Sequence, residues 1–228
     1  MLDVRSTDFA AILFDMDGLL LDTESIALKL FEETITQAGF EWSEEVGRLM
    51  IGRNGKDADA LLSSHYGTDK RFSIGPVRAE FLNKYQTHLQ ERGVPLKPGA
   101  KELLGGLQRQ GVDCALVTSS RRSLTDMKLQ KAGIADFFQV RIYGDEVTRG
   151  KPDPQCYLLA AEKLVVEPRR CLVLEDSAPG ITAALAAGMT AWWVPDKSPP
   201  TTELLEKGAV VFESLQKVWL RLESACQV

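Results

Sequence analysis

The chain has 228 residues, of which 44% are hydrophobic and 26% are charged, and its formal net charge is -5 at pH 7. This composition is typical of a globular protein, and the length allows one large domain or a core domain with a smaller one attached. The acidic balance argues against a nucleic-acid partner, because such proteins usually carry a basic excess on one face. An anionic ligand would need local positive groups, namely a metal ion, a lysine or helix N-termini.

The cysteines and the N-terminal residues favour a cytoplasmic protein. Three of the four cysteines lie in apolar segments and none forms a Cys-x-x-Cys pair, which is typical of small core residues in a reducing compartment. The N-terminal residues contain no apolar run of signal-peptide length, and no later run approaches the ~18 apolar residues of a membrane span. We therefore expect no membrane partner.

The segment from Phe9 to Gly18 combines an apolar strand with two carboxylates. The apolar run 9–14 has strand length and ends directly in Asp15 and Asp17. Residues two apart on an extended segment point the same way, so the two carboxylates can converge while Met16 turns into the core. Gly18 then allows the backbone to turn away beside them. A polar turn after a buried strand is the simpler interpretation of this pair alone.

The next part of the chain has helical periodicity. Apolar residues recur at helical spacing over 24–38, with Gly39 as a stop signal, and residues 43–88 predict further helices separated by glycine-bearing breaks. We expect about four helices and no strand. The sequence therefore predicts a small all-helical insert over 21–94, within a core formed by residues 1–20 and 95–228.

From residue 100 onward, strand and helix patterns alternate. The predicted strands after 9–14 cover 112–117, 140–143, 171–174, 190–194 and 210–212, and the predicted helices cover 100–109, 124–132, 154–164, 181–187 and 214–224. Strands separated by helices imply a parallel sheet with helices on both faces. The predicted fold class is α/β, a Rossmann-like doubly wound parallel sheet with an inserted all-helical domain.

Polar residues follow several of these strands and meet at one edge of the predicted sheet. Ligands of such sheets bind outside the carboxyl ends of the strands. The residues expected there are Asp15, Asp17, Thr118, Ser119, Ser120, Lys151, Glu175 and Asp176. Crowded carboxylates cannot all ionise without a cation, and oxygen ligands without His or Cys favour Mg²⁺.

The residue types at this edge suit phosphoryl transfer. A carboxylate can act as the nucleophile and form an aspartyl-phosphate. A second acid can protonate the leaving alkoxide and later take a proton from water. Hydroxyl and ammonium groups can hold the equatorial phosphoryl oxygens.

These motifs together resemble the haloacid dehalogenase superfamily. The resemblance covers nearly the whole chain: it rests on the sequence DMDG that begins at Asp15, on the hydroxyl of Thr118, on Lys151 in GKPDP and on LEDS at Glu175 and Asp176. The insert after the first motif resembles that of the β-phosphoglucomutase-like branch, which has a helical cap over the site.

The resemblance implies a role for each motif residue. It implies that Asp15 is the nucleophile and a metal ligand, and that Asp17 is the acid and base, with its backbone carbonyl on the metal. Thr118 and Lys151 would bind the phosphoryl group, with Ser119 beside them. Asp176 would bind Mg²⁺, and Glu175 would do so directly or through water.

The insert decides the substrate in this family. Its expected specificity loop contains Arg53, Asn54 and Lys56, although a solvated turn with surface cations is an equal alternative. β-Phosphoglucomutases carry a histidine and a lysine in the insert that hold a second phosphate, and the matching positions here resemble Ala27 and Phe81. This departure favours water as the final acceptor, and Asp17 argues against a dehalogenase.

We therefore expect a monomeric, cytoplasmic, Mg²⁺-dependent phosphatase of small phosphorylated metabolites, with sugar phosphates as the expected class. A phosphosugar mutase of the β-phosphoglucomutase type is the first alternative. A binding or regulatory module without turnover is the second, because fold does not imply function. An inactive relative would be expected to lose Asp15, Asp17 or Lys151, and all three are present.

Overall fold

The structure is a computed structural model that describes residues 9–50, 55–196 and 199–223. Its contacts divide the chain into two compact units. One unit combines Met1–Asp22 with Pro95–Val228, and the other is Thr23–Val94. We call them the sheet unit and the helical unit and describe each by itself.

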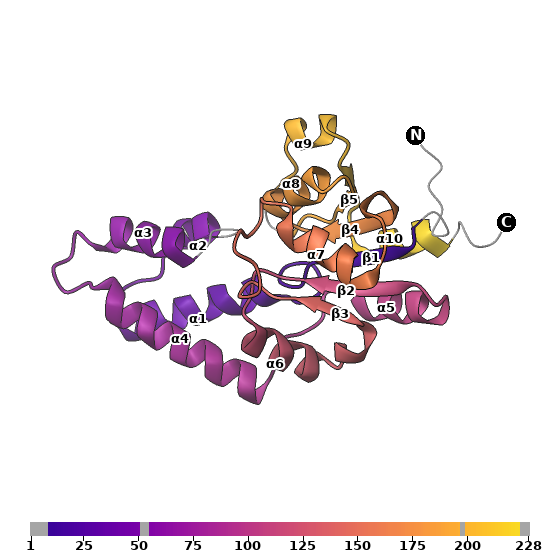
Figure 1. Cartoon of the computed structure of the whole chain (residues 1–228). Helices are drawn as coiled ribbons and strands as arrows, with labels where there is room; N and C mark the ends of the chain where they lie inside the picture. The colour runs from indigo at the N-terminus through magenta and orange to yellow at the C-terminus, as the bar shows by residue number, and fades with distance from the viewer. Residues whose placement is uncertain (1–8, 51–54, 197–198, 224–228) are drawn as a thin grey trace. The chain divides into compact units, whose positions relative to one another are not determined.

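The sheet unit is built on a six-stranded sheet in which every neighbouring pair is parallel. Its strand order is β3-β2-β1-β4-β5-β6, so β1 lies between β2 and β4 (Figure 1). The strands are β1 (Ala11–Phe14), β2 (Asp113–Val117), β3 (Val140–Ile142), β4 (Cys171–Glu175), β5 (Thr190–Trp193) and β6 (Val210–Val211). All four residues of β1 are buried, as expected for an inner strand of a parallel sheet.

Helices cover both faces of this sheet. Ala11 and Leu13 of β1 belong to a buried cluster with residues of α7 and α8 on one face. Phe14 points to the other face and contacts the ring of Phe138, and α5 packs against β2 and α10. The helices of this unit are α5 (Ala100–Arg109), α6 (Arg122–Ala132), α7 (Gln155–Leu164), α8 (Ala178–Ala186), α9 (Thr202–Glu206) and α10 (Leu215–Glu223).

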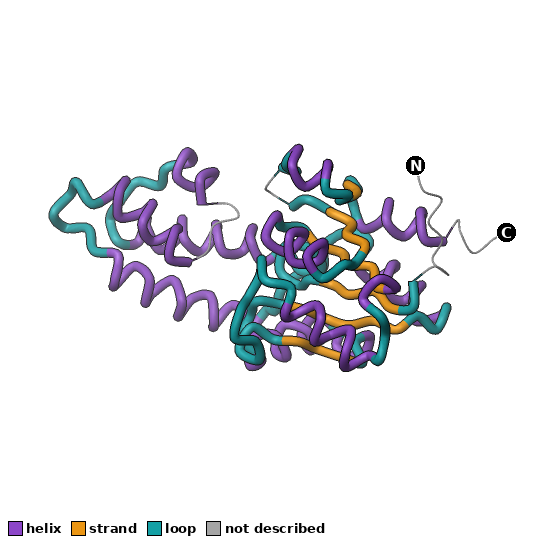
Figure 2. The backbone as a smooth tube through the Cα atoms, turned by 45° about the horizontal axis from the view of Figure 1, so that its top comes forward, coloured by secondary structure: helices purple, strands orange, loops and turns teal. Residues whose placement is uncertain are grey.

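The helical unit contains four helices among its described residues. They are α1 (Thr23–Gln37), α2 (Glu44–Met50), α3 (Gly55–Tyr66) and α4 (Ile74–Glu91), and α1 lies beside α4 (Figure 1). In Figure 2 the described part of this unit is drawn as helices joined by loops. Their apolar faces form one buried cluster, in which the rings of Phe31 and Phe81 stack with centroids 3.7 Å apart. No strand occurs in the part of this unit that the structure describes.

The predicted fold class is confirmed, with small differences at element ends. The strand predicted over 9–14 begins at Ala11, and the helix predicted over 181–187 begins at Ala178 because Ser177 accepts a capping hydrogen bond from Gly180 N. Helix α9 was not predicted, because five residues are too few to show a helical period. Within the described ranges, no helix is both long and apolar enough to cross a membrane.

Candidate active site

The site lies where three neighbouring strands end. Asp15 follows β1, Thr118 follows β2, and Glu175 is the last residue of β4. Because β1 lies between β2 and β4, the parallel register brings these three chain segments together at one edge of the sheet. The sequence prediction that they converge there is therefore met by the strand order.

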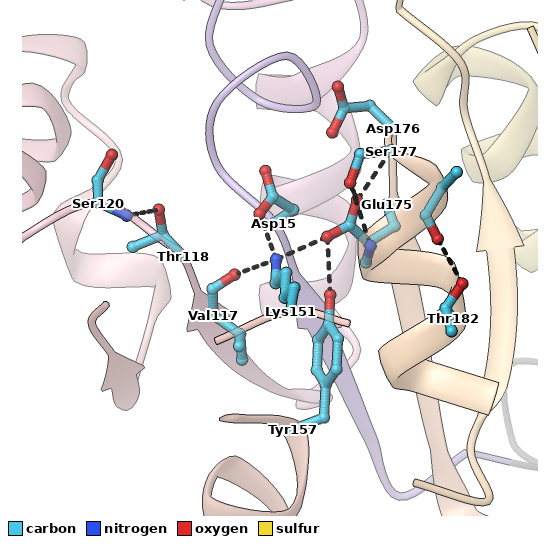
Figure 3. Close-up of polar contacts among 12 residues, drawn as sticks. Asp15, Val117, Thr118, Ser120, Lys151, Tyr157, Glu175, Asp176, Ser177 and Thr182 are labelled. Atoms are coloured by element: carbon cyan, nitrogen blue, oxygen red, sulfur yellow. Dashed lines mark hydrogen bonds and ion pairs between the residues drawn. The ribbon is translucent and has the colours of Figure 1, made fainter. Parts of the chain in front are cut away.

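Lys151 lies at the centre of this group. Its Nζ donates to Oδ1 of Asp15 at 2.5 Å, to Oε1 of Glu175 at 2.6 Å and to the carbonyl oxygen of Val117 at 3.0 Å (Figure 3). The side chain is 6% exposed. Burial alone would lower the pKa of Lys151, but the carboxylates of Asp15 and Glu175 raise it well above its ordinary value. The lysine is therefore a fixed cation beside Asp15.

Glu175 receives donors on both carboxylate oxygens. Oε1 accepts from Lys151 and, at 3.0 Å, from the hydroxyl of Tyr157, while Oε2 accepts from the backbone N at 2.9 Å and the hydroxyl at 2.8 Å of Ser177. Burial would raise the pKa of Glu175, but Lys151 and Ser177 together lower it. This carboxylate is therefore ionised and fully engaged within the protein. The arrangement fits a residue that holds Lys151, and it does not fit the direct metal ligand that the sequence suggested.

Asp15 supplies a negative charge that the single ammonium of Lys151 does not balance, because Lys151 also contacts Glu175. It is 7% exposed, and burial raises its pKa to about 7, with Glu175 and Asp17 acting in the same direction and Lys151 opposing them. Two buried carboxylates share one ammonium, so the site has room for another positive charge. This is the electrostatic condition that a divalent cation would satisfy.

The positions of Asp176 and Asp17 complete the fit to Mg²⁺. A Cβ atom built at Gly18 would lie 2.3 Å from Oδ2 of Asp176, so this carboxylate packs against the backbone next to Asp17. Gly18 has φ +88°, a conformation that glycine adopts readily. In the described ranges, no three His, Cys, Asp or Glu side chains are grouped as a metal site. Mg²⁺ commonly takes one or two carboxylates and keeps several waters, so Asp15, Asp176 and the carbonyl of Asp17 fit it.

Asp17 is held by two residues of the sheet unit. Its Oδ1 accepts from Nζ of Lys128 at 2.7 Å, and its Oδ2 accepts from the hydroxyl of Ser120 at 2.7 Å. Its side chain is 30% exposed. Solvent therefore reaches the carboxylate in part, which suits the predicted exchange of protons with substrate and water.

The turn after β2 presents hydroxyl groups. Thr118 is 3% exposed, and its Oγ1 accepts from the backbone N of Ser120 at 3.0 Å, which leaves its own proton for donation. Ser119 is exposed beside it. The position of Thr118, next to the Val117 carbonyl that binds Lys151, suits a phosphoryl-oxygen donor.

The predicted residues of the helical unit have a different outcome. Arg53 and Asn54 lie outside the described residues. Lys56 is exposed in the first turn of α3. Its contact with substrate stays a prediction.

Sequence reasoning missed Lys128 and Tyr157. Tyr157 is completely buried in α7, and burial raises the pKa of its phenol well above the ordinary value, so the hydroxyl stays a donor to Glu175. Lys128 stands on the buried face of α6. The available sequence signal was its place beside Leu129 in a predicted helix, on a face that also carries Thr125.

Comparison with known proteins places this site in a family. The profile of the haloacid dehalogenase-like hydrolase family matches residues 12–194. The chain belongs to this family. The match runs from β1 to the end of β5 and includes Asp15, Lys151 and Asp176. The resemblance noted from the motifs is thereby confirmed.

Several relatives cover most of this hydrolase. The phosphorylated carbohydrates phosphatase of Thermotoga maritima is 31% identical over 216 residues, covering 91% of this chain and 95% of that protein. The bifunctional riboflavin kinase/FMN phosphatase of Arabidopsis thaliana is 29% identical, and this chain spans 55% of its length. A HAD family hydrolase from Deinococcus radiodurans R1, solved with bound phosphate and sodium, has a TM-score of 0.81 at 28% identity and 96% coverage of both chains.

Proposed function

We propose that this hydrolase is a Mg²⁺-dependent phosphatase that works through phosphorylated Asp15. The observation that carries the proposal is the buried Asp15 carboxylate at the end of β1, held by the ammonium of Lys151. A carboxylate nucleophile beside a fixed cation, with a second carboxylate two residues on, is the equipment that phosphoryl transfer through an aspartyl-phosphate needs.

The first step transfers the phosphoryl group to the protein. An oxygen of Asp15 forms a bond to phosphorus as the ester bond from phosphorus to the leaving oxygen breaks. Asp17 donates its proton to the leaving alkoxide, which departs as an alcohol. Thr118 donates to one equatorial phosphoryl oxygen, where negative charge collects during transfer. Lys151 has three donor hydrogens, so it donates to another phosphoryl oxygen by exchanging its contact with Asp15 Oδ1 for it.

The second step returns the nucleophile. Water attacks phosphorus, and Asp17, now ionised, takes the proton that water loses. The bond between phosphorus and the Asp15 oxygen breaks, which releases inorganic phosphate and restores the carboxylate. The two steps together hydrolyse one phosphoric monoester, and Asp17 ends with the proton it had at the start.

Three groups would hold Mg²⁺. They are the carboxylates of Asp15 and Asp176 and the backbone carbonyl of Asp17, with water completing the shell. When bound, Mg²⁺ supplies positive charge against the phosphoryl oxygens and the Asp15 carboxylate. In this scheme Glu175 holds Lys151, and its neighbour Asp176 would bind Mg²⁺.

Sugar phosphates are the substrate class that we propose, in agreement with the name of the Thermotoga maritima relative, a phosphorylated carbohydrates phosphatase. The helical unit would serve as the cap that selects among them, with Arg53, Asn54 and Lys56 as candidates to contact the leaving group. Cytoplasmic location and the monomeric state stay predictions.

The mutase alternative is weakened by the packing of the helical unit. Phe81, which stands near the position of the second-phosphate lysine in β-phosphoglucomutases, is 6% exposed and stacks on Phe31. An apolar ring packed in this way cannot bind a phosphate. The non-catalytic alternative is weakened by the contacts of Lys151 with Asp15 and Glu175, because an inactive relative would be expected to lose Asp15, Asp17 or Lys151.

Phosphate release provides the test. We expect Mg²⁺-dependent release from at least one member of a panel of sugar phosphates, nucleotides, phosphoglycolate and pseudouridine phosphate, and loss of release in Asp15→Asn. Isomerisation of a hexose 1-phosphate in the presence of a bisphosphate activator would instead support the mutase. No turnover in either assay would overturn the enzymatic proposal for these substrates.

A further inference from the structure

Helix α6 carries a buried lysine to the edge of the proposed site. The side chain of Lys128 is 4% exposed and shares the buried face of α6 with Thr125 and Leu129. Lysine is almost never fully buried unless a partner accepts its charge. The Nζ of Lys128 donates to Oδ1 of Asp17 at 2.7 Å. The lysine is therefore placed by the fold to meet Asp17.

The other oxygen of Asp17 is fixed from a different element. The hydroxyl of Ser120, in the turn between β2 and α6, donates to Oδ2 at 2.7 Å. One donor on each oxygen fixes the plane of the carboxylate as well as its position. A carboxylate oxygen accepts about two hydrogen bonds, so each oxygen keeps room for a leaving-group oxygen or a water.

The pair is poorly suited to a purely stabilising role. The side chain of Asp17 is 30% exposed and water could solvate it without help, whereas that of Lys128 is 4% exposed. Burying an ammonium has a desolvation cost that a methionine of similar volume would not have. A buried charge that faces a partly exposed carboxylate is expected where the orientation of that carboxylate matters.

We propose that Lys128 is a positioning residue, which holds the carboxylate of Asp17 in the orientation that proton exchange with the substrate requires. This inference rests on the proposed phosphatase function. Lys128 acts through Asp17, while Lys151 acts on Asp15 and the phosphoryl group, so the two buried lysines have separate tasks.

A double-mutant cycle tests this assignment. The rate of Asp15 phosphorylation is measured by rapid quench with a sugar phosphate for the wild type, Lys128→Met, Asp17→Asn and the double variant. We expect Lys128→Met to lower this rate by about 30-fold, which is less than the roughly 100- to 10,000-fold that a general acid contributes, because Asp17 itself is still present. If Lys128 acts through Asp17, the double variant is as slow as Asp17→Asn alone. A double variant whose rate loss equals the product of the two single losses would overturn the proposal.

The leaving group provides a second readout. p-Nitrophenolate leaves without protonation, so an acid that is out of place matters little for p-nitrophenyl phosphate. We expect Lys128→Met to slow the first step with this substrate by less than about threefold. Equal losses with both substrates would overturn the proposal, because a general loosening of the site would not depend on the leaving group.

The melting temperature of Lys128→Met and a matched lysine variant distinguish a positioning role from a structural one. Lys131 is exposed on the same helix, and Lys131→Met should leave both rates unchanged. Lys128→Met should melt at or above the temperature of the wild type, since it removes a buried charge. A wild type that releases no phosphate would instead overturn the proposed function. Turnover that Lys128→Met does not alter would overturn this inference alone.

Discussion

Gly180 lies so close to Glu175 that a Cβ atom at position 180 would be 1.8 Å from Oε1 of the carboxylate. The glycine is in the first turns of α8, where an alanine would normally favour the helix by about 1 kcal/mol. Glu175 is completely buried and engaged by four donors, so it cannot move aside without breaking that arrangement. We expect Gly180→Ala to lower the melting temperature and to reduce kcat.

A second helical glycine provides the control for this prediction. A Cβ atom at Gly105 in α5 would meet only the end of the Arg109 side chain, at 3.4 Å. Gly105→Ala should therefore keep kcat and raise stability by up to about 1 kcal/mol. Thermal melting and phosphate release compare the two variants, and a Gly180→Ala protein that behaves like Gly105→Ala would contradict the packing argument.

The raised pKa of Asp15 predicts how stability depends on pH. The pKa is about 7 in the folded protein and 3.8 as its ordinary value, so the folded state binds more protons and loses stability as pH rises from about 4 to 7. Asp15→Asn removes this ionisation. Its melting temperature without Mg²⁺ should exceed that of the wild type by roughly 10 °C at pH 8, and by less at pH 5.

Metal provides the control for the pH prediction. Saturating Mg²⁺ supplies the missing positive charge and should stabilise the wild type more than Asp15→Asn, since the variant has lost the charged ligand. Melting curves at pH 5 and pH 8, with and without Mg²⁺, measure both effects. An Asp15→Asn protein less stable than the wild type at pH 8 without Mg²⁺ would show that Asp15 is not the excess charge.

The convergence of the site could be predicted from sequence because it depends on strand order and on little else. Asp15 and Thr118 follow strands whose apolar patterns are clear, and parallel strands end at one edge of a sheet. Two features could not be predicted. The first is the set of contacts of Glu175, which the resemblance assigned to the metal directly or through water; two of its donors, Lys151 and Tyr157, come from other segments of the chain.

The role of Lys128 was hidden for a related reason. Its contact with Asp17 joins residues 111 positions apart, and it depends on the rotation of α6 about its own axis. The sequence pattern gives that rotation only through the apolar residues beside it, such as Leu129. Motif residues can therefore be predicted from a single sequence, whereas the residues that orient them can be identified only from the packed structure.

Tyr157→Phe isolates one hydrogen bond of the buried network. The hydroxyl donates to Oε1 of Glu175 at 3.0 Å, and its loss leaves a buried carboxylate with one donor fewer. We expect a loss of about 2 kcal/mol in the free energy of unfolding, and a fall of a few fold in kcat at constant KM, because Lys151 would be less firmly held. Urea unfolding and steady-state kinetics measure the two effects.

A second tyrosine is the matched control for Tyr157→Phe. The hydroxyl of Tyr143 donates to Asp126, whose side chain is 43% exposed and can be solvated by water instead. Tyr143→Phe should therefore cost less than about 1 kcal/mol and leave kcat unchanged. Equal stability losses in the two variants would contradict the importance of the Glu175 contact.

Asp176→Asn tests the assignment of the metal ligands. The side chain packs against Gly18, the residue after Asp17, and an amide has nearly the same volume as a carboxylate but no charge. We expect the Mg²⁺ concentration at half-maximal activity to rise by about 10- to 100-fold.

Glu175→Gln should instead lower kcat with a smaller change in this concentration, because Glu175 contacts Lys151. Asp136 is exposed in a short 3-10 helix, Ala135–Phe137, and Asp136→Asn is the control that should alter neither value. Magnesium titrations of phosphate release measure all three variants. A larger rise in the half-maximal Mg²⁺ concentration for Glu175→Gln than for Asp176→Asn would show that Glu175 is a metal ligand.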